Sequence, residues 1–569
     1  MDRNLLLAFA LSFAVLMVWT MSQEKPQPPR PELDATQLAE SEDRTRLPAP
    51  SELPPTPSER GPVVRSPEVS PAPTSVGGME SLISVDRPLY SAQLTTQGAA
   101  LREWYLSAES NYDQGPRRDH SPLVLTTATG TRDVLTTPFL ELGLGDLSKA
   151  IFEKEDTLGD GYAFTYRSGN VTVRKHYHFE EESYAFRLQV EVRNDSAETV
   201  PADFVIEWPA KTYDAPDFVE QSLIVLFEGD TDFQPLNAFG IPSFFSRNPD
   251  QEEVFGQEVD WGGVQTTYFL GVLLPESPAQ AKAKIVALEP GELGLVELSY
   301  PTVHIPPGQS FVREYRGYIG PKEVERLTAL GGDTIRSIDL GWSWVEPLTR
   351  FFSWFLGVVY GFVGNYGVAI IVLTILVRVA TLPLTMKQMR SMERMRALQP
   401  QVKEVQANFK DDKQKQSEAM MALYRKEKVN PLSGCLPMVL QLPVFIGLFY
   451  ALRSSIHLRQ APFVGWIDDL SAPEELFVIP GLDLPVRILP LLMGASMYVQ
   501  QKITPMQMDP AQAKMMITVM PVMMTLLFYQ FPSGLVLYWM VSNVLAITHQ
   551  TWVGRGLKRQ GKPQLEPQK

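Results

Sequence analysis

The chain has 569 residues, with 65 Asp and Glu against 51 Lys and Arg and a formal net charge of -14 at pH 7. That length exceeds what one ordinary hydrophobic core holds, so two or more structural units are expected. A single cysteine, Cys435, excludes an intramolecular disulfide and a metal site built from several cysteines.

The charges are divided unevenly along the chain. Residues 22–350 hold 51 acidic and 28 basic residues, whereas residues 378–434 hold 6 acidic and 12 basic residues. Membrane proteins show this division when their cytoplasmic loops retain Lys and Arg. The composition therefore indicates a membrane protein with an acidic region on one side of the bilayer and a basic region on the other.

The chain begins with a charge-flanked apolar run, MDRNLLLAFALSFAVLMVWTM. Its exit, VWTMSQEK, lacks the small-x-small pattern of a signal-peptide cleavage site, and the run just reaches the lower length limit of a spanning helix. We interpret residues 1–22 as a retained transmembrane anchor in preference to a cleaved signal peptide. Residues 23–78 are dominated by Pro, Glu, Ser and Thr, which predicts a disordered or partly polyproline linker.

Residues 79–340 have the pattern of a β-domain. In YAFRLQVEVRND, large apolar side chains occupy every second position from Tyr184 to Val192, as in a half-buried strand. Similar short runs recur between Gly, Pro, Asn and Asp turns, which predicts a large antiparallel β-sandwich. His176 and His178 fall on one face of a strand and could bind a metal. Because the sequence shows no third ligand, we favour ordinary solvated histidines.

Helical periodicity begins after residue 340. Val345, Leu348, Phe352, Phe355 and Val359 recur at spacings of three and four. This pattern predicts an amphipathic helix lying along the membrane surface, with neighbouring tryptophans in the headgroup zone. The sequence GFVGN is expected to end that helix.

Five apolar spans follow the amphipathic helix, at residues 365–384, 435–453, 485–502, 514–531 and 533–551. Together with the anchor they give six crossings, which place both chain ends in the cytoplasm and the acidic β-domain outside. None of the five spans contains an acidic residue.

Arg378 is a lone cation in the apolar run TILVRVATLPL. An arginine at the centre of a spanning helix costs about 2.5–3.5 kcal/mol on insertion scales. One interpretation is snorkelling, in which the side chain reaches the cytoplasmic headgroups. The other is a water-containing groove, which Thr374, one turn earlier, and Gln441, in the next span, could also line. Such a groove would lower the penalty for moving polar chain into the membrane, which indicates a protein that helps polypeptides to insert.

The basic segment at residues 385–430 has the pattern of an antiparallel helical hairpin. Apolar residues recur every three or four positions from Met386 to Phe409, and KDDK supplies a turn before a second helix from about Gln414 to Lys428. Pro400 should kink the first arm. The methionine-rich face suits varied apolar client segments, although an ordinary hairpin seam explains it equally well.

The sequence resembles the YidC/Oxa/Alb family of membrane protein insertases. The resemblance rests on ILVRVATLPLTMKQM, MRALQPQV, MMALYRKEKVNPLSGCLPMVLQLPVF, RQAPFVGWIDDLSA and FPSGLVLYWMVSNV. It implies a multi-domain membrane protein of the Gram-negative form, with a periplasmic β-supersandwich that is dispensable for much of the insertion activity. It also implies an α-helical five-span insertase core at residues 341–552, with a hydrophilic groove closed to the periplasm, and a basic cytoplasmic tail at residues 553–569.

The same resemblance implies roles for particular residues. Arg378 matches the groove arginine, Thr374 the polar residue one turn before it, and Gln441 a groove glutamine. Tyr538 and Trp539 stand where the family has an aromatic pair, although Trp539 replaces a tyrosine, and Gln530 stands where some relatives have tryptophan. Further positions that the resemblance implies to contact clients are Leu442, Phe445, Met389 and Met392.

The implied partners are nascent membrane proteins, the Sec translocon, the ribosome and membrane lipids, in the bacterial inner membrane. We expect insertion alone or with Sec, with no nucleotide, cofactor, metal or enzymatic activity. The main alternative is a secondary transporter or channel, but such proteins usually carry an intramembrane carboxylate or repeat symmetry, and the sequence shows neither. An intramembrane hydrolase would rely on His549, which reads more simply as an interfacial residue. A purely structural scaffold leaves Arg378 unexplained.

Overall fold

The computed structural model describes residues 79–107, 124–126, 133–155, 161–211, 221–235, 252–256, 258–409, 412–427, 436–480, 484–503 and 510–559. The predicted anchor and linker and the end of the basic tail lie outside these residues. Two compact regions are described below, a β-rich region up to Pro321 and a helical region after residue 345.

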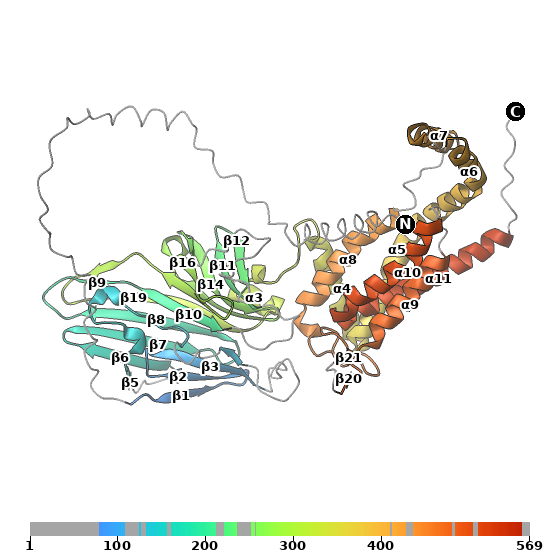
Figure 1. Cartoon of the computed structure of the whole chain (residues 1–569). Coiled ribbons are helices and arrows are strands. Elements are labelled where there is room, and N and C mark those ends of the chain that lie inside the picture. The colour runs from blue at the N-terminus through green and yellow to red at the C-terminus, as the bar shows by residue number, and fades with distance from the viewer. Residues whose placement is uncertain are drawn as a thin grey trace, which may run out of the picture. The chain divides into compact units, whose positions relative to one another are not determined.

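The largest sheet of the β-rich region has nine strands in the order β12-β11-β14-β15-β19-β8-β7-β6-β5 (Figure 1). Every neighbouring pair in it is antiparallel. In chain order its strands are β5 (Glu153–Glu155), β6 (Gly161–Ser168), β7 (Val171–Phe179), β8 (Ala185–Asn194), β11 (Gln221–Phe227), β12 (Asp230–Pro235), β14 (Val259–Thr266), β15 (Phe269–Pro275) and β19 (Gln309–Pro321).

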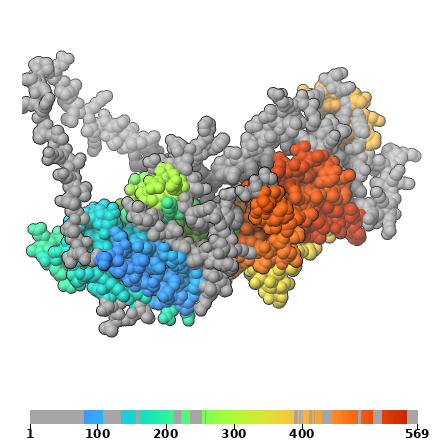
Figure 2. All heavy atoms as spheres, turned by 60° about the horizontal axis from the view of Figure 1, so that its bottom comes forward, coloured from blue at the N-terminus to red at the C-terminus, as the bar shows by residue number. Residues whose placement is uncertain are grey.

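Two four-stranded sheets and a two-stranded sheet complete this region. The first has the order β1-β2-β3-β4 and the second the order β10-β17-β16-β13, while β18 pairs with β9. Strands β1 to β3 form part of the molecular surface in the space-filling view, where they are blue (Figure 2). The bounds are β1 (Leu82–Asp86), β2 (Tyr90–Thr95), β3 (Ala100–Leu106), β4 (Val124–Thr126), β9 (Val200–Ala202), β10 (Val205–Lys211), β13 (Glu252–Phe255), β16 (Lys282–Glu289), β17 (Leu293–Ser299) and β18 (Val303–Ile305).

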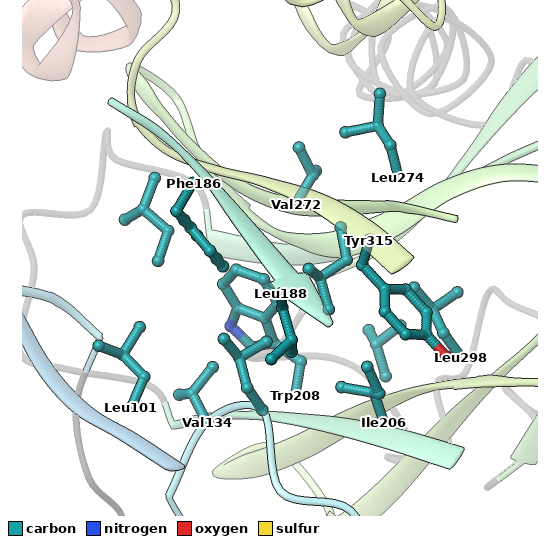
Figure 3. Packing of buried hydrophobic residues seen from close by; sticks show 14 of the residues in the cluster. Leu101, Val134, Phe186, Leu188, Ile206, Trp208, Val272, Leu274, Leu298 and Tyr315 are labelled. Carbon is teal, nitrogen blue, oxygen red and sulfur yellow. The ribbon is translucent and has the colours of Figure 1, made fainter. Parts of the chain in front are cut away.

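The core of the β-rich region lies between these sheets. Figure 3 shows side chains of the nine-stranded sheet facing side chains of β3, β10 and β17 across it. Trp208 packs so closely on the large sheet that a Cβ at Gly271 would lie 2.7 Å from its ring. The predicted β-sandwich is confirmed, because the facing sheets bury side chains against one another in a common core. Strands β7 and β8 alternate between buried and more exposed positions, whereas β11 and β15 are buried on both faces.

Strand β8 shows the alternation that the sequence predicted. Phe186, Leu188, Val190 and Val192 are buried, whereas Arg187 is exposed. On the neighbouring strand β7, His176 is half-buried and His178 is exposed on the same face. Among the described residues, no cluster of three or more His, Cys, Asp or Glu has the arrangement of a metal site.

Lys175 breaks the alternation of β7, because it lies on the buried face between Val173 and Tyr177. The side chain is fully buried, and Nζ donates to the carbonyl oxygens of Gly98 at 3.1 Å and Leu135 at 2.6 Å. Burial away from water disfavours the charged form and lowers the pKa of Lys175 to about 7. The sequence pattern gave no sign of this buried cation.

The helical region contains eight longer helices among the described residues. A short hairpin, β20 (Phe477–Ile479) with β21 (Leu484–Val486), interrupts them. The helices are α4 (Glu346–Val363), α5 (Tyr366–Ala397), α6 (Gln399–Asn408), α7 (Lys413–Lys426), α8 (Leu436–Ser454), α9 (Ile488–Ile503), α10 (Pro510–Leu527) and α11 (Ser533–Arg559). The positions of α5 and α8 to α11 match those of the five apolar spans.

By length and composition, one described helical segment, Tyr366–Met386, is long and apolar enough to cross a membrane, and Ile517–Gln530 is a shorter apolar helix. Helix α4 buries Phe352 and Leu356 on one side, while its other side exposes Arg350 together with large apolar side chains such as Trp354 and Phe362, which are 62% and 87% exposed. It ends at Gly364, whose φ of 64° is left-handed and suits glycine.

The basic segment contains the end of α5, which runs to Ala397, followed by α6 and α7, which are joined near the predicted turn. Asp412 caps α7, because its side chain accepts from the Lys415 amide at 3.0 Å. Buried Leu398 packs against Tyr424, which holds the two arms together. Pro400 lies in the first turn of α6, so the first arm is divided into two helices near the position where a kink was expected.

Candidate functional site

Arg378 lies in α5, and its guanidinium contacts a hydroxyl of α11. Its Nε donates to Ser542 Oγ at 3.0 Å, and a terminal nitrogen donates to the same oxygen. Ser542 is buried and Arg378 is half-buried. Within the described ranges Arg378 forms no ion pair with a carboxylate. A neutral hydroxyl therefore holds this cation in place without cancelling its charge.

Gln441 of α8 reaches the same side of α11, where its amide nitrogen donates to the Tyr538 hydroxyl. Tyr538 is fully buried and lies four residues before Ser542, so the two side chains occupy one face of α11. Gln441 is half-buried. Helices α5 and α8 thus place polar groups against adjacent turns of α11.

A third polar contact joins α11 to α9. Asn543 is buried, and its amide nitrogen donates to Ser496 Oγ at 3.0 Å. Since Asn543 follows Ser542 directly, it points about 100° further round the helix, toward α9. The polar groups of α11 therefore face three helices within about two turns.

Aromatic rings border this polar cluster. The Trp539 ring lies edge-to-face with Phe445 and with Phe528, with centroids 4.9 Å apart in both pairs. The two residues of the predicted aromatic pair therefore make different kinds of contact. Tyr538 forms a hydrogen bond with Gln441, whereas Trp539 packs against apolar rings. Such edge-to-face contacts fix ring positions and add to the area that packing buries.

The remaining candidate residues have different surroundings. Thr374 is fully buried, and its hydroxyl donates to the Ile370 carbonyl of its own helix at 2.6 Å. Leu442 is 55% exposed, on the side of α8 next to Gln441. Met389 and Met392 lie in the last part of α5, beyond the predicted apolar span, and their side chains are outside the described residues.

Hydrogen-bonding groups of this kind suit a polypeptide. A guanidinium carries five N–H donors, of which two contact Ser542, so others remain able to meet a carboxylate or a backbone carbonyl. Tyrosine, serine and glutamine both donate and accept. Of these residues, Arg378 and Gln441 are half-buried, whereas Tyr538 and Ser542 are buried.

Two family models match most of the chain. Residues 82–355 match the YidC periplasmic domain, and residues 358–560 match the family described as 60Kd inner membrane protein. A Membrane protein insertase YidC from Syntrophus aciditrophicus (strain SB) is 34% identical over 98% of this chain and 100% of its own length. The chain belongs to the YidC membrane protein insertase family.

Other members of the YidC family match over similar lengths. The insertase of Pelobacter propionicus is 36% identical over 89% of this chain and 95% of its own. A crystal structure described as an active YidC insertase aligns with 84% of this chain and 95% of that chain, at 18% identity and a TM-score of 0.37.

Sequence reasoning singled out Arg378, Gln441 and Tyr538, but it missed three residues that the helices bring to them. These are Ser542, Asn543 and Ser496. A signal was present, since Ser542 and Asn543 are adjacent polar residues in an apolar run and follow Tyr538 by one turn. Polar side chains in a membrane helix usually face a partner helix, so this spacing could have identified them.

Proposed function

We propose that this protein inserts membrane proteins into the inner membrane by accepting their polar residues beside Arg378. The observation that carries the proposal is the partner of Arg378, which is the neutral Ser542 hydroxyl. An arginine paired with an acid would be electrically satisfied, whereas one held by a hydroxyl keeps its charge for a client. Family membership supports the same activity, because the curated relatives are named membrane protein insertases.

The physical effect of the groove is to reduce desolvation. Moving a polar group into hydrocarbon without a hydrogen-bond partner costs several kcal/mol. Arg378 from α5 and Gln441 from α8 are half-buried and supply such partners, while the buried Tyr538 and Ser542 of α11 hold their side chains in place. A client segment passing them would retain hydrogen bonds until its apolar part reaches lipid.

Several finer assignments belong to this proposal. The clients are nascent membrane proteins delivered by ribosomes, inserted by this protein alone or with the Sec translocon. Thr374, Trp539, Leu442, Phe445, Met389 and Met392 line or border the client path. The chain crosses the membrane six times with both ends in the cytoplasm, and α4 lies on the outer surface with Trp354 among the lipid headgroups. Insertion is energetically downhill and consumes no nucleotide.

Reconstitution of the purified protein alone in lipid vesicles tests this function. A short single-span client should acquire protease protection, and Arg378→Ala should reduce the protected fraction. Arg350→Ala is the matched control, because Arg350 is an exposed arginine of α4 paired with Glu346 at 2.7 Å and should leave insertion unchanged.

Equal client protection in empty vesicles would contradict the proposal. Ion-driven uptake of a small solute by the same vesicles would favour the transporter alternative.

A further inference from the structure

One loop contacts the beginnings of three helices of the core. This loop, residues 460–474, lies between α8 and the β20–β21 hairpin that precedes α9, and is called the clamp segment here. At α5, Asn365 Nδ2 donates to the Phe463 carbonyl at 3.1 Å while Asn365 Oδ1 accepts from the Val368 amide at 3.0 Å. Gly367 packs directly on the clamp segment, since a Cβ there would lie 2.0 Å from the Phe463 ring.

The clamp segment also holds the beginning of α11. The Ser533 amide donates to the Ala472 carbonyl at 2.8 Å, and the Gly534 amide donates to the Leu470 carbonyl at 2.9 Å. The Ser533 hydroxyl donates to the Asp469 carbonyl at 2.7 Å. Two amides in the first turn of α11, which have no partner within the helix, are thereby satisfied by the clamp segment.

At α9 the contact is made by an acidic side chain. One carboxylate oxygen of Glu474 accepts from the Leu489 amide in the first turn of α9, and the other accepts from Trp466 Nε1. Glu474 is 4% exposed. A carboxylate is favoured at this position because amide donors and the helix dipole both attract negative charge. Glu474 therefore joins α9 to Trp466 within the clamp segment.

The three clamped helices carry the polar cluster. Arg378 lies in α5, Ser496 in α9, and Ser542 and Asn543 in α11. The position of α9 relative to α11 decides whether Ser496 meets Asn543. We propose that Glu474 is a positioning residue for the groove, because its buried carboxylate fixes the beginning of α9 against the loop that also holds α5 and α11. The functional part of this inference rests on the proposed insertase function.

If Glu474 only capped α9, its removal would affect only the first turn of that helix. A positioning role predicts an effect two turns further along, where Ser496 lies seven residues after Leu489. The two roles therefore differ in what happens to the contact between α9 and α11. Glu475 offers a matched control, because it is the next residue, is also acidic and is exposed.

Disulfide formation between α9 and α11 tests the positioning role in the full-length protein. Cysteines replace Ser496 and Asn543 in a Cys435→Ser background, and membranes are treated with an oxidant. Glu474→Ala should lower the cross-linked fraction about fivefold, since it removes a charge-assisted contact, whereas Glu475→Ala should leave it unchanged. Equal cross-linking in Glu474→Ala and Glu475→Ala would overturn the proposal.

A milder variant covers the case in which Glu474→Ala does not fold. Glu474→Gln retains one oxygen to accept from the Leu489 amide, so it should fold and lower cross-linking about twofold. Unchanged cross-linking in Glu474→Gln, with Glu474→Ala unfolded, would mean that the carboxylate serves folding alone and would overturn the proposal.

The insertion assay separates this inference from the proposed function. Glu474→Ala, without the added cysteines, should slow client insertion by a factor similar to its loss of cross-linking. Lower cross-linking with unchanged insertion would keep the structural role of Glu474 and overturn its role in the groove. Failure of the unsubstituted protein to insert a client would instead contradict the proposed function.

Discussion

Arg378 has a partner of a kind that the sequence did not suggest. The sequence left two interpretations, snorkelling to the headgroups or a water-containing groove, and excluded a carboxylate partner within the apolar spans; the structure places a serine hydroxyl at 3.0 Å from Nε. Hydrogen bonding to a hydroxyl orients the guanidinium while leaving its charge in place. Ser542 therefore fixes the orientation of the guanidinium, whereas Arg378 itself supplies the positive charge.

Removing the Ser542 hydroxyl should weaken the core by a small but measurable amount. Ser542→Ala leaves Arg378 without its described acceptor, and polar contacts between membrane helices are worth about 0.6 kcal/mol on average. Thermal unfolding in detergent of Ser542→Ala, Arg378→Ala and the double variant gives the coupling between the two residues. Strictly additive effects would show that the hydrogen bond contributes nothing to stability.

Lys175 is the second residue whose surroundings differ from its sequence pattern. The pKa of lysine in the unfolded chain is about 10.5, whereas the pKa of Lys175 in the folded protein is about 7. Between these two values the unfolded state holds more protons, so the free energy of unfolding must rise as pH increases. Below about pH 7 both states are protonated, and the cost of burying the charge is present in full.

The Lys175→Met variant tests this linkage. The free energy of unfolding of the β-rich region should rise between pH 7 and 9 in the natural protein, by up to about 1.4 kcal/mol per pH unit from this one group. Lys175→Met should lose that part of the slope. Denaturant unfolding at several pH values, followed by tryptophan fluorescence, measures both proteins, and identical slopes would contradict the assigned burial of a titrating lysine.

At the scale of elements, one glycine at the start of α5 packs directly on the clamp segment, whereas a glycine in α4 does not pack against any described residue. Gly367 at the start of α5 lies against the Phe463 ring, where an added Cβ would be 2.0 Å away, whereas a Cβ at Gly361 in α4 would meet open space. A side chain at Gly367 would therefore push α5 away from the clamp segment, and a side chain at Gly361 would not.

The expected effects of alanine at these two glycines have opposite signs. Alanine favours helix by up to about 1 kcal/mol over glycine, so Gly361→Ala should leave the melting temperature in detergent unchanged or slightly raised. Gly367→Ala should lower it, because overpacking costs about 1–3 kcal/mol. A melting temperature for Gly367→Ala equal to that of Gly361→Ala would contradict the close packing of α5 on the clamp segment.

Most helices and strands could be predicted from the sequence, because the hydrophobic patterns that mark them are local. The alternation from Tyr184 to Val192 marked β8, and the five apolar runs marked α5 and α8 to α11. Contacts between elements were not predictable in the same way. Nothing near Glu474 in the sequence indicates that it meets Leu489, and the burial of Lys175 depends on backbone carbonyls 40 and 77 residues away.

At the scale of the whole molecule, the uneven distribution of charge along the chain predicts how the protein is oriented across the membrane. The described hairpin, α6 with α7, belongs to the basic segment, while the β-rich region is acidic. Because cytoplasmic segments retain Lys and Arg, the proposed topology has these two regions on opposite sides of the membrane.

Labelling with a membrane-impermeant maleimide measures this orientation. In a Cys435→Ser background, cysteine at exposed Glu181, between β7 and β8, should react in intact spheroplasts. Cysteine at exposed Gln414 in α7 should react only after lysis. Equal reaction of both positions in intact cells would contradict six crossings with a cytoplasmic hairpin.

The central claim is that a client passes beside the Arg378 cluster, and photo-cross-linking during insertion tests it most directly. A photoreactive residue replacing Gln441 lies in the cluster, whereas one replacing Leu526 lies on an exposed apolar face of α10, where the side chain is 71% exposed. With a stalled single-span client, position 441 should give the main cross-linked product and position 526 little. Client cross-linking at position 526 that equals or exceeds that at position 441 would contradict the account.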